Sequence, residues 1–399
     1  MIKKIWLFLF EGKCTFNLLC CLLWGRSLLH YFGGAIRKVT GIENITADNF
    51  TIVVICIALF FALPELIRRI KIQDCLLYLS FVAVYLLQFL FYPDNTETLE
   101  LFFVKCCLAV FPFFLYGKVL DIVKMEKAFS IISYATILVT IFYFMLYGEG
   151  SKTISSDDYD MGTAYALLPY LLFTTWQAFR NTSIVNIVLS ICGFFFLLGL
   201  GTRGPVLAFL FPLLFYIFIL YRGRYAKTLK LSLFVLILGS GLLLIPLTLY
   251  LTDIFETLDI STRILDKIIE EELDNDSGRG DLIMQLDQVR DSENRLWGYG
   301  LFGSYNYIGI YPHNIFYEFI FSFGVVLGGG LIVVLLYHFY SGYRKANLSI
   351  EKEFITLFVL MELIHLCFSY TFMCESIFFL LIGYCSQMKY VYSKKHYAI

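Results

Sequence analysis

Long apolar stretches recur along the chain and are separated by short polar segments. Each approaches the roughly 20 residues of helix that cross the hydrocarbon core of a bilayer. The pattern predicts about twelve membrane spans, near residues 14–34, 50–66, 75–92, 99–117, 128–147, 161–179, 183–200, 204–221, 229–251, 315–340, 353–372 and 376–392. Residues 1–399 are therefore expected to form one integral membrane domain with an all-α, polytopic fold.

The connection between the ninth and tenth spans, residues 252–314, is much longer than the others, and we expect it to contain short helices. Apolar residues within 254–273 recur at helical spacing, as in an amphipathic helix at a membrane interface. A second helix is expected after Asp276 or Ser277, since either side chain can cap a helix N-terminus. Its buried face would consist of Leu282, Ile283, Leu286 and Val289.

The composition supports a membrane protein. Hydrophobic residues make up 59% of the chain and charged residues only 16%, whereas about a quarter of the residues of a soluble domain are charged. The 41 Phe and 28 Tyr suit spans with interfacial aromatic belts. The net charge of −1 gives no reason to expect nucleic acid as a partner. Most of the 11 cysteines lie in or beside apolar runs, and we interpret them as packing residues.

The distribution of basic residues predicts the orientation. Most of the 31 Lys and Arg residues fall in segments on the same side of the membrane as the N-terminus, and such segments are normally cytoplasmic. Twelve spans then place both termini in the cytoplasm and loop 252–314 outside, where its acidic residues outnumber the basic ones. The N-terminus begins like a signal peptide, but its apolar run is short and no cleavage is expected.

Two arginines stand out on the predicted outer side. Arg203 lies in the turn 201–205 (GTRGP) between two spans, and a charge at the membrane edge is costly without a partner; the alternative is a snorkelling surface Arg. Arg279 lies in 277–281 (SGRGD), in the first turn of the predicted helix. A guanidinium beside free helix N–H groups suits a phosphate. The alternative, favoured on this motif alone, is a solvated Arg paired with an aspartate.

A third motif, 311–314 (YPHN), directly precedes the tenth span. His313 can take a proton near neutral pH. Asn314 can cap the following helix or hold the imidazole, and Glu318, about one turn further on, could orient His313 or pair with an Arg. The alternative is a capping turn with an incidental His.

The segment 297–305 interleaves glycines with aromatic residues, including Tyr299, whose rings could stack on sugar faces. Interfacial aromatic residues are the preferred interpretation for most of these rings. Within the spans, Lys105, Glu362 and His365 need partners. Glu362 and His365 are three residues apart on one helix face, which we interpret as a structural ion pair rather than as the proton relay of a transporter.

The order and sidedness of these motifs resemble the O-antigen polymerase and ligase family of bacterial envelope enzymes. The resemblance covers residues 199–340. It comprises Gly201–Gly204, the helix start at Arg279, the glycine-aromatic stretch 296–300, His313-Asn314, and the glycine-rich segments 323–325 and 328–330. Trp297 stands where a proline is usual.

The resemblance implies a GT-C-like membrane glycosyltransferase that is metal-independent, needs no cofactor, and lies in the bacterial inner membrane. Its donor would be a glycan on undecaprenyl diphosphate. Arg203 and Arg279 would hold the diphosphate, while His313 would either act as the base toward the acceptor hydroxyl or donate a hydrogen bond to the phosphate. Asn314, Tyr299 and Glu318 complete the expected substrate site. Membrane lipid, a chain-length regulator and a flippase of the same pathway are the expected partners.

Several alternatives remain open. We favour a polymerase, which extends lipid-linked repeat units, over a ligase, because an acidic outer loop would repel phosphorylated lipid A-core. A flippase or other transporter is less favoured, since the notable polar groups gather on one side of the membrane and no internal repeat is present. A non-catalytic scaffold would not need two arginines and a histidine at one edge.

Overall fold

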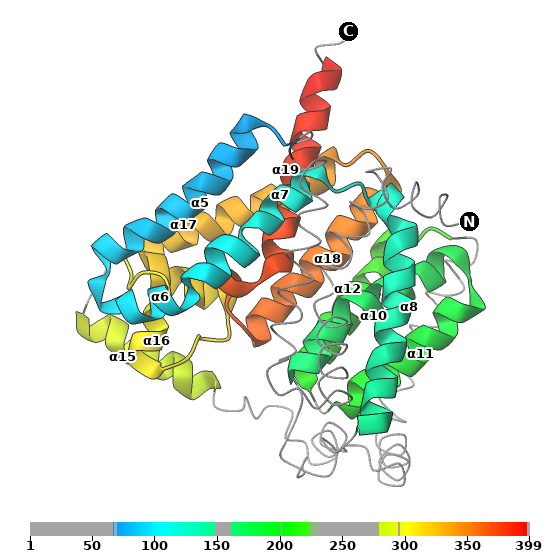
Figure 1. The fold of residues 1–399 in the computed structure, drawn as a ribbon, viewed down its shortest axis with the longest axis horizontal. Helices are drawn as coiled ribbons and strands as arrows, with labels where there is room; N and C mark the ends of the chain where they lie inside the picture. Colours follow the sequence, from blue (N-terminus) through cyan, green and yellow to red (C-terminus); the bar gives the residue numbers. More distant parts are fainter. Residues whose placement is uncertain are drawn as a thin grey trace, which may run out of the picture. The chain divides into compact units, whose positions relative to one another are not determined.

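The computed structural model describes residues 70–147, 161–200, 202–223, 279–293 and 296–396, with the single positions 67 and 227. Every regular element in these residues is a helix (Figure 1). The predicted spans 14–34, 50–66 and 229–251 and the predicted amphipathic helix 254–273 lie outside the described residues.

Five helical stretches of the described chain are long and apolar enough to cross a membrane. They are α5 (Ile72–Phe91); the run Pro93–Val119, made of η1 (Pro93–Asn95), α6 (Thr96–Val104), the π-helix η2 (Lys105–Val110) and α7 (Pro112–Val119); Met125–Phe142 within α8 (Ile122–Tyr147); α12 (Arg203–Phe215) with the π-helix η3 (Tyr216–Leu220); and α17 (Ile315–Lys345). These match five of the predicted spans, so the all-α, polytopic membrane fold is confirmed. The count of twelve stays a prediction.

Four further predicted spans are also helical. They correspond to α10 (Met161–Asn181), α11 (Ile184–Gly199), α18 (Ser349–Phe368) and α19 (Ser376–His396). The remaining elements are α15 (Arg279–Glu293), α16 (Gly303–Ile308) and η5 (Phe372–Cys374). Two of the helices, α15 and α16, fall within the loop 252–314, where short helices were expected.

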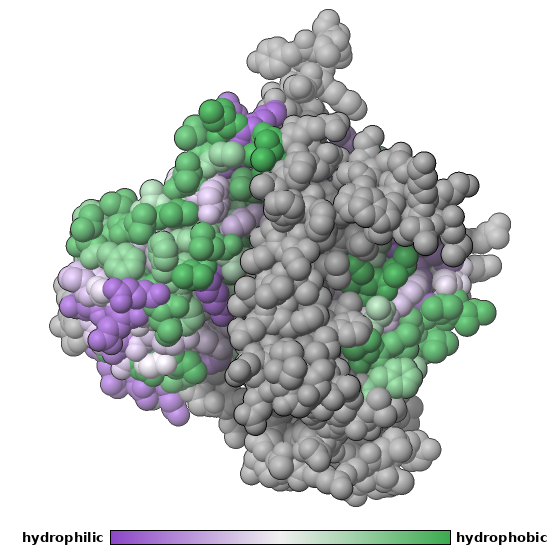
Figure 2. Space-filling view, in the orientation of Figure 1, coloured by the Kyte–Doolittle hydropathy of each residue, from purple (hydrophilic) through white to green (hydrophobic). Residues whose placement is uncertain are grey.

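The outer surface of α5 is apolar, as a lipid-facing helix requires. Ile72, Leu76, Leu90 and Phe91 are all at least 60% exposed. Figure 2 shows hydrophobic side chains over α5 and hydrophilic ones over the neighbouring η1, α6 and α15. This surface is therefore apolar over α5 and polar over η1, α6 and α15.

The chain divides into two compact units, residues 1–62 with 123–275 and residues 63–122 with 276–399. In the first unit, α10 packs against α11 and α12. An ion pair of 3.0 Å joins Arg180 of α10 to Glu126 of α8, and the rings of Phe129 and Phe173 meet edge to face at 4.4 Å. Whether 1–399 behaves as one integral membrane domain stays a prediction.

In the second unit, α7 and α19 pack with their backbones in close approach. A Cβ on Gly117 would lie 2.0 Å from the carbonyl oxygen of Leu380, and a Cβ on Gly383 would lie 2.0 Å from that of Phe114. Small residues at such crossings allow the dense packing that holds helices together in lipid. Glycine is therefore required on both helices at this crossing.

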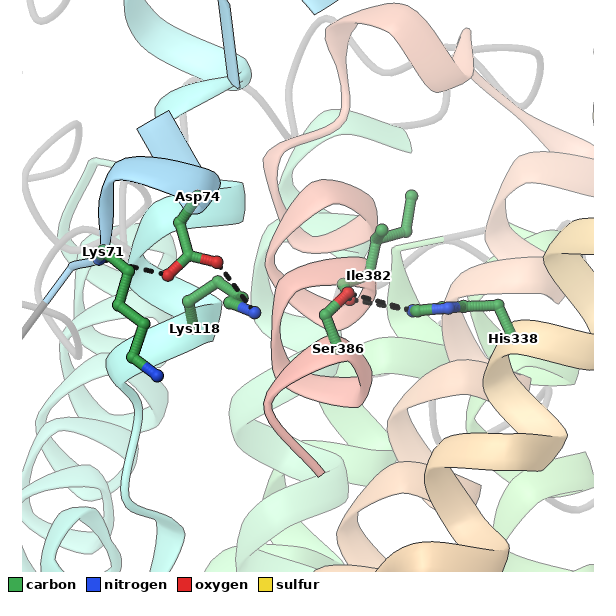
Figure 3. Close-up of polar contacts among 6 residues, drawn as sticks. All are labelled: Lys71, Asp74, Lys118, His338, Ile382 and Ser386. Carbon is green, nitrogen blue, oxygen red and sulfur yellow. Dashed lines mark hydrogen bonds and ion pairs between the residues drawn. The ribbon is translucent and has the colours of Figure 1, made fainter. Parts of the chain in front are cut away.

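Polar contacts also join helices of the second unit (Figure 3). Asp74 near the start of α5 accepts from the Lys71 amide at 3.2 Å and pairs with the Lys118 ammonium of α7 at 2.9 Å. His338 of α17 meets the Ile382 carbonyl of α19 at 3.0 Å. Because lipid offers no hydrogen bonds, such pairs inside a membrane protein satisfy one another.

Candidate functional site

A kink in α17 shapes the candidate site in the second unit. Gly324 interrupts the helix with φ 77° and ψ 167°, a conformation open essentially to glycine alone. The break displaces the amides that would otherwise bond to the carbonyls of Phe321 and Ser322 one turn earlier. The amides of Tyr299 and Gly300 donate to these two carbonyls instead, each at 2.9 Å. The segment 296–300 thus completes the helix at its kink.

This contact explains the glycines of the 296–300 segment. A Cβ on Gly298 would lie 2.4 Å from the Gly324 nitrogen, and a Cβ on Gly324 would lie 1.8 Å from the Leu296 carbonyl oxygen. Gly298 and Gly300 also have left-handed backbones, with φ of 73° and 78°, which glycine adopts without steric cost. The glycine pattern therefore serves a close backbone crossing.

Tyr299 lies inside the protein core. Its ring is 2% exposed and stacks on Phe321 at 4.5 Å, and its hydroxyl donates to the Val289 carbonyl at 3.1 Å. Leu286 of α15 completes this cluster. In this position Tyr299 joins the 296–300 segment to α15 and α17.

Polar side chains of α5 and η1 hold the same segment from the other side. The Asn95 amide donates to the carbonyls of Tyr299, at 2.7 Å, and Leu301, at 3.1 Å. Gln88 accepts from the Leu301 amide at 3.0 Å. Both side chains are buried, so these bonds satisfy groups that would otherwise be costly to remove from water.

Arg279 is the first residue of α15, as the sequence predicted. The helix is fixed to α17 because the Tyr317 hydroxyl donates to Asp287 at 2.8 Å; Asp287 also pairs with Arg290 at 3.0 Å. Of the predicted buried face of α15, Leu286 is fully buried and Val289 packs against the same cluster. The start of α15 therefore belongs to a helix that is attached to the start of α17.

His313 and Asn314 form the entry to α17. His313 has a left-handed backbone, with φ 53°, and is partly exposed. The Asn314 carbonyl oxygen Oδ1 accepts from the amides of Phe316, at 3.0 Å, and Tyr317, at 3.2 Å. Asn314 is thus the N-cap, as one of the two sequence interpretations expected. Because it occupies these first-turn amides, they are not open to a bound anion.

Glu318, on the first turn of α17, binds the connection between α18 and α19. Its carboxylate accepts from the Thr371 hydroxyl and from the Phe372 amide at 3.4 Å. Glu318 is 5% exposed, and the rings of Phe319 and Phe372 stack beside it at 4.5 Å. It therefore fixes residues 371–372 against the helix that follows His313.

A partly exposed cluster of tyrosines is joined to His313 through Tyr311. The Tyr311 ring lies 4.4 Å from the His313 ring and 6.0 Å from the Tyr370 ring, and Tyr305 lies 6.2 Å from Tyr311. Burial raises the pKa of Tyr311 above its ordinary value. Tyr370 could not be predicted from the sequence, because no local pattern connects the α18–α19 turn to the segment before α17.

Arg203 lies in the first unit and is the first residue of α12, after the N-cap Thr202. Its side chain is partly exposed, and Gly204 and Pro205 are buried. The pattern of an arginine at the start of a helix is therefore the same for Arg203 and Arg279. Each is placed where backbone amides and a positive helix end favour anions.

The predicted pair Glu362 and His365 is present near the end of α18, with 3.8 Å between Oε2 and Nδ1. Both residues are buried. Together with Glu375 they form the described group that could hold a metal ion, with ligand atoms within 4.8 Å of one another.

The fold and these polar features define a multi-pass membrane protein with a polar site at the start of α17. Residues 188–335 match the family model described as O-antigen ligase, and all six predicted site residues fall within this match. The chain therefore carries this domain, and the predicted resemblance to the family of O-antigen polymerases and ligases is confirmed. Its members are glycosyltransferases of polysaccharide biosynthesis that use undecaprenyl-diphosphate-linked glycans. No curated protein and no solved structure matches the chain.

Proposed function

We propose that the protein polymerises undecaprenyl-diphosphate-linked repeat units of an O-antigen or capsular polysaccharide. The growing glycan passes from its lipid carrier to the next lipid-linked unit. The observation that carries this proposal is that Arg203, Arg279 and His313 all fall within the O-antigen ligase domain. We expect the protein in the bacterial inner membrane with both termini cytoplasmic, and a flippase and chain-length regulator of the same pathway as its partners.

In the proposed reaction, an acceptor hydroxyl attacks the anomeric carbon of the donor glycan. A new glycosidic bond forms, the bond from that carbon to the diphosphate oxygen breaks, and undecaprenyl diphosphate leaves. Negative charge therefore builds on the diphosphate, and the guanidinium groups of Arg203 and Arg279 neutralise it. Guanidinium groups can perform this task without a metal ion.

We assign the acceptor proton to His313. The adjacent amides of α17 already donate to Asn314, which argues against a phosphate at that helix start and favours proton transfer there. Asn314 and Glu318 would act by positioning, since the first caps the helix after His313 and the second holds residues 371–372 beside it. Tyr299 would contribute by supporting the 296–300 segment from within the core.

The surface of the second unit favours a polymerase over a ligase. Asp94, Glu97 and Glu100 are exposed on η1 and α6, and Asp281 and Asp291 are exposed on α15. Figure 2 shows this hydrophilic zone beside the apolar face of α5. Fixed negative charge disfavours the approach of a phosphorylated lipid A-core. It is compatible with an acceptor sugar presented on its own lipid carrier.

The test uses the purified protein in nanodiscs with lipid-linked repeat units as the only glycan. A polymerase converts them into a ladder of longer lipid-linked glycans. Arg203→Ala, Arg279→Ala and His313→Ala should each lower this rate by about 10²–10³-fold, while Arg344→Ala, at the far end of α17, should not. Transfer to added lipid A-core without any ladder would identify a ligase instead.

A further inference from the structure

Lys105 is a charged residue within a candidate span, and no pattern in the sequence indicates its partner. It lies in the run Pro93–Val119, where it begins the π-helix η2. π-Helical segments inside α-helices are frequent at functional sites, and an ionisable residue in a span needs a partner or a function. Lys105 also lies outside the segment 188–335 that matches the family model.

The contacts of Lys105 orient its ammonium group but do not neutralise it. The Nζ atom donates to the Tyr370 hydroxyl at 2.6 Å and lies 5.1 Å from the centroid of the Tyr370 ring and 5.8 Å from that of Phe102. Among the residues that the structure describes, no carboxylate forms an ion pair with Lys105. Lys118, on the same run of helix, pairs with Asp74 at 2.9 Å (Figure 3).

Tyrosine rings connect Lys105 to His313. Tyr370, which holds the ammonium, lies 6.0 Å from Tyr311, and Tyr311 lies 4.4 Å from His313. Burial raises the pKa of Tyr311, and the Lys105 charge acts on the same phenol in the opposite direction. Lys105, Tyr311, His313 and Tyr370 are all partly exposed. An oriented cation without a carboxylate partner is therefore linked to the proposed base through two tyrosines, Tyr370 and Tyr311.

We propose that Lys105 is a further anion-binding residue of the donor site and contacts a phosphate oxygen of the polyprenyl diphosphate. This deepens the proposed function and rests on it. A lysine carried by a membrane-spanning run is suited to a phosphate group tethered to a hydrocarbon tail. An acidic sugar would lie farther from the lipid. The Tyr370 hydroxyl holds the flexible lysine side chain in place before the donor binds, so that its ammonium group is ready to contact the incoming phosphate.

Binding of undecaprenyl diphosphate without glycan, measured on the full chain in nanodiscs, tests the proposal. Lys105→Gln should weaken binding by roughly tenfold or more, since a hydrogen bond to a charged group is lost. Lys105→Arg should retain most of the affinity, and Tyr370→Phe should lose several-fold. The matched control is Lys352→Gln, because Lys352 also lies over a tyrosine ring, that of Tyr343 at 5.9 Å, but belongs to the first turn of α18 and not to η2.

A measurement on the unmodified chain covers the case in which Lys105→Gln does not fold. Undecaprenyl diphosphate should protect Lys105, but not Lys352, from acetylation by acetic anhydride. Equal acetylation of Lys105 with and without the lipid overturns the proposal. So does a Lys105→Gln protein that binds undecaprenyl diphosphate normally and loses affinity only for glycan-bearing donors. If the wild type binds the lipid through Lys105 but forms no polymer, the proposed function fails and the phosphate contact stands.

Discussion

Replacing Gly324 by alanine should separate the 296–300 segment from α17. The new Cβ would lie 1.8 Å from the Leu296 carbonyl oxygen, too close for any real contact. The backbone at φ 77° and ψ 167° costs a non-glycine residue about 1–3 kcal/mol. Displacement of the segment also loses the bonds from Tyr299 and Gly300 to α17, both 2.9 Å long, each worth about 0.5–1.5 kcal/mol.

The total is about 2–6 kcal/mol, which should lower the midpoint of thermal unfolding by several degrees. Hydrogen exchange gives a more local measurement. Peptides covering 296–302 should exchange faster in Gly324→Ala because two of their amides lose their acceptors. Polymer synthesis should fall as well, although Gly324 takes no part in the chemistry, because the same segment supports the start of α17.

Gly329 provides a matched control on the same helix. A Cβ at Gly329 would meet no atom within 4 Å, and alanine favours a helix over glycine by about 0.5–1 kcal/mol. Gly329→Ala should therefore be neutral or slightly stabilising, with unchanged exchange at 296–302. The reasoning is refuted if Gly324→Ala keeps the wild-type unfolding midpoint and the wild-type exchange at 296–302, or if both variants change these properties equally.

Three further predictions concern single contacts and the topology. Asn314→Ala loses both capping bonds and should lower the free energy of unfolding by about 1 kcal/mol and remove much of the activity. Asn314→Asp keeps the cap, so equal behaviour of the two variants would contradict the capping role. Thr371→Val removes a hydrogen-bond donor from buried Glu318 and should lower the free energy of unfolding by about 1–3 kcal/mol. In thermal unfolding Thr371→Ser should stay near wild type, and an unchanged midpoint in Thr371→Val would argue against this contact. An impermeant thiol reagent should label Asp276→Cys in intact spheroplasts and Lys394→Cys only after lysis; the reverse would invert the predicted orientation.

Features that depend on local chemistry were predictable from the sequence. Apolar length indicated the spans, and the start of α15 at Arg279 agrees with a helix predicted from local sequence signals. The cap at Asn314 was one of two interpretations of the same motif. In each case the decisive contacts lie within a few residues, so a linear pattern contains them.

Features that depend on distant segments were not predictable in this way. The sequence pointed to the glycine-rich segments 323–325 and 328–330 alike, but only the structure shows that the helix breaks at Gly324, where a segment from another part of the chain crosses. Tyr299 lies in the core because its segment completes that break, a position that neither of the two interpretations of the glycine-aromatic stretch, sugar stacking or an interfacial belt, indicated. Lys105 meets Tyr370 across 265 positions of sequence, and no local pattern connects them.

Backbone strain is concentrated around the proposed site. In the part of the chain that the structure describes, Phe302, His313, Tyr370 and Thr182 are the non-glycine residues with positive φ. The first three are linked through rings, since Phe302 and Tyr305 are 6.2 Å apart and Tyr305 leads through Tyr311 to both His313 and Tyr370. Each such backbone costs of order 1–3 kcal/mol and persists only where surrounding contacts enforce it. The contacts of Asn95, Asn314 and Glu318 enforce it here. The His313 imidazole and the Lys105 ammonium thereby lie at the two ends of the Tyr311–Tyr370 pair before any substrate arrives.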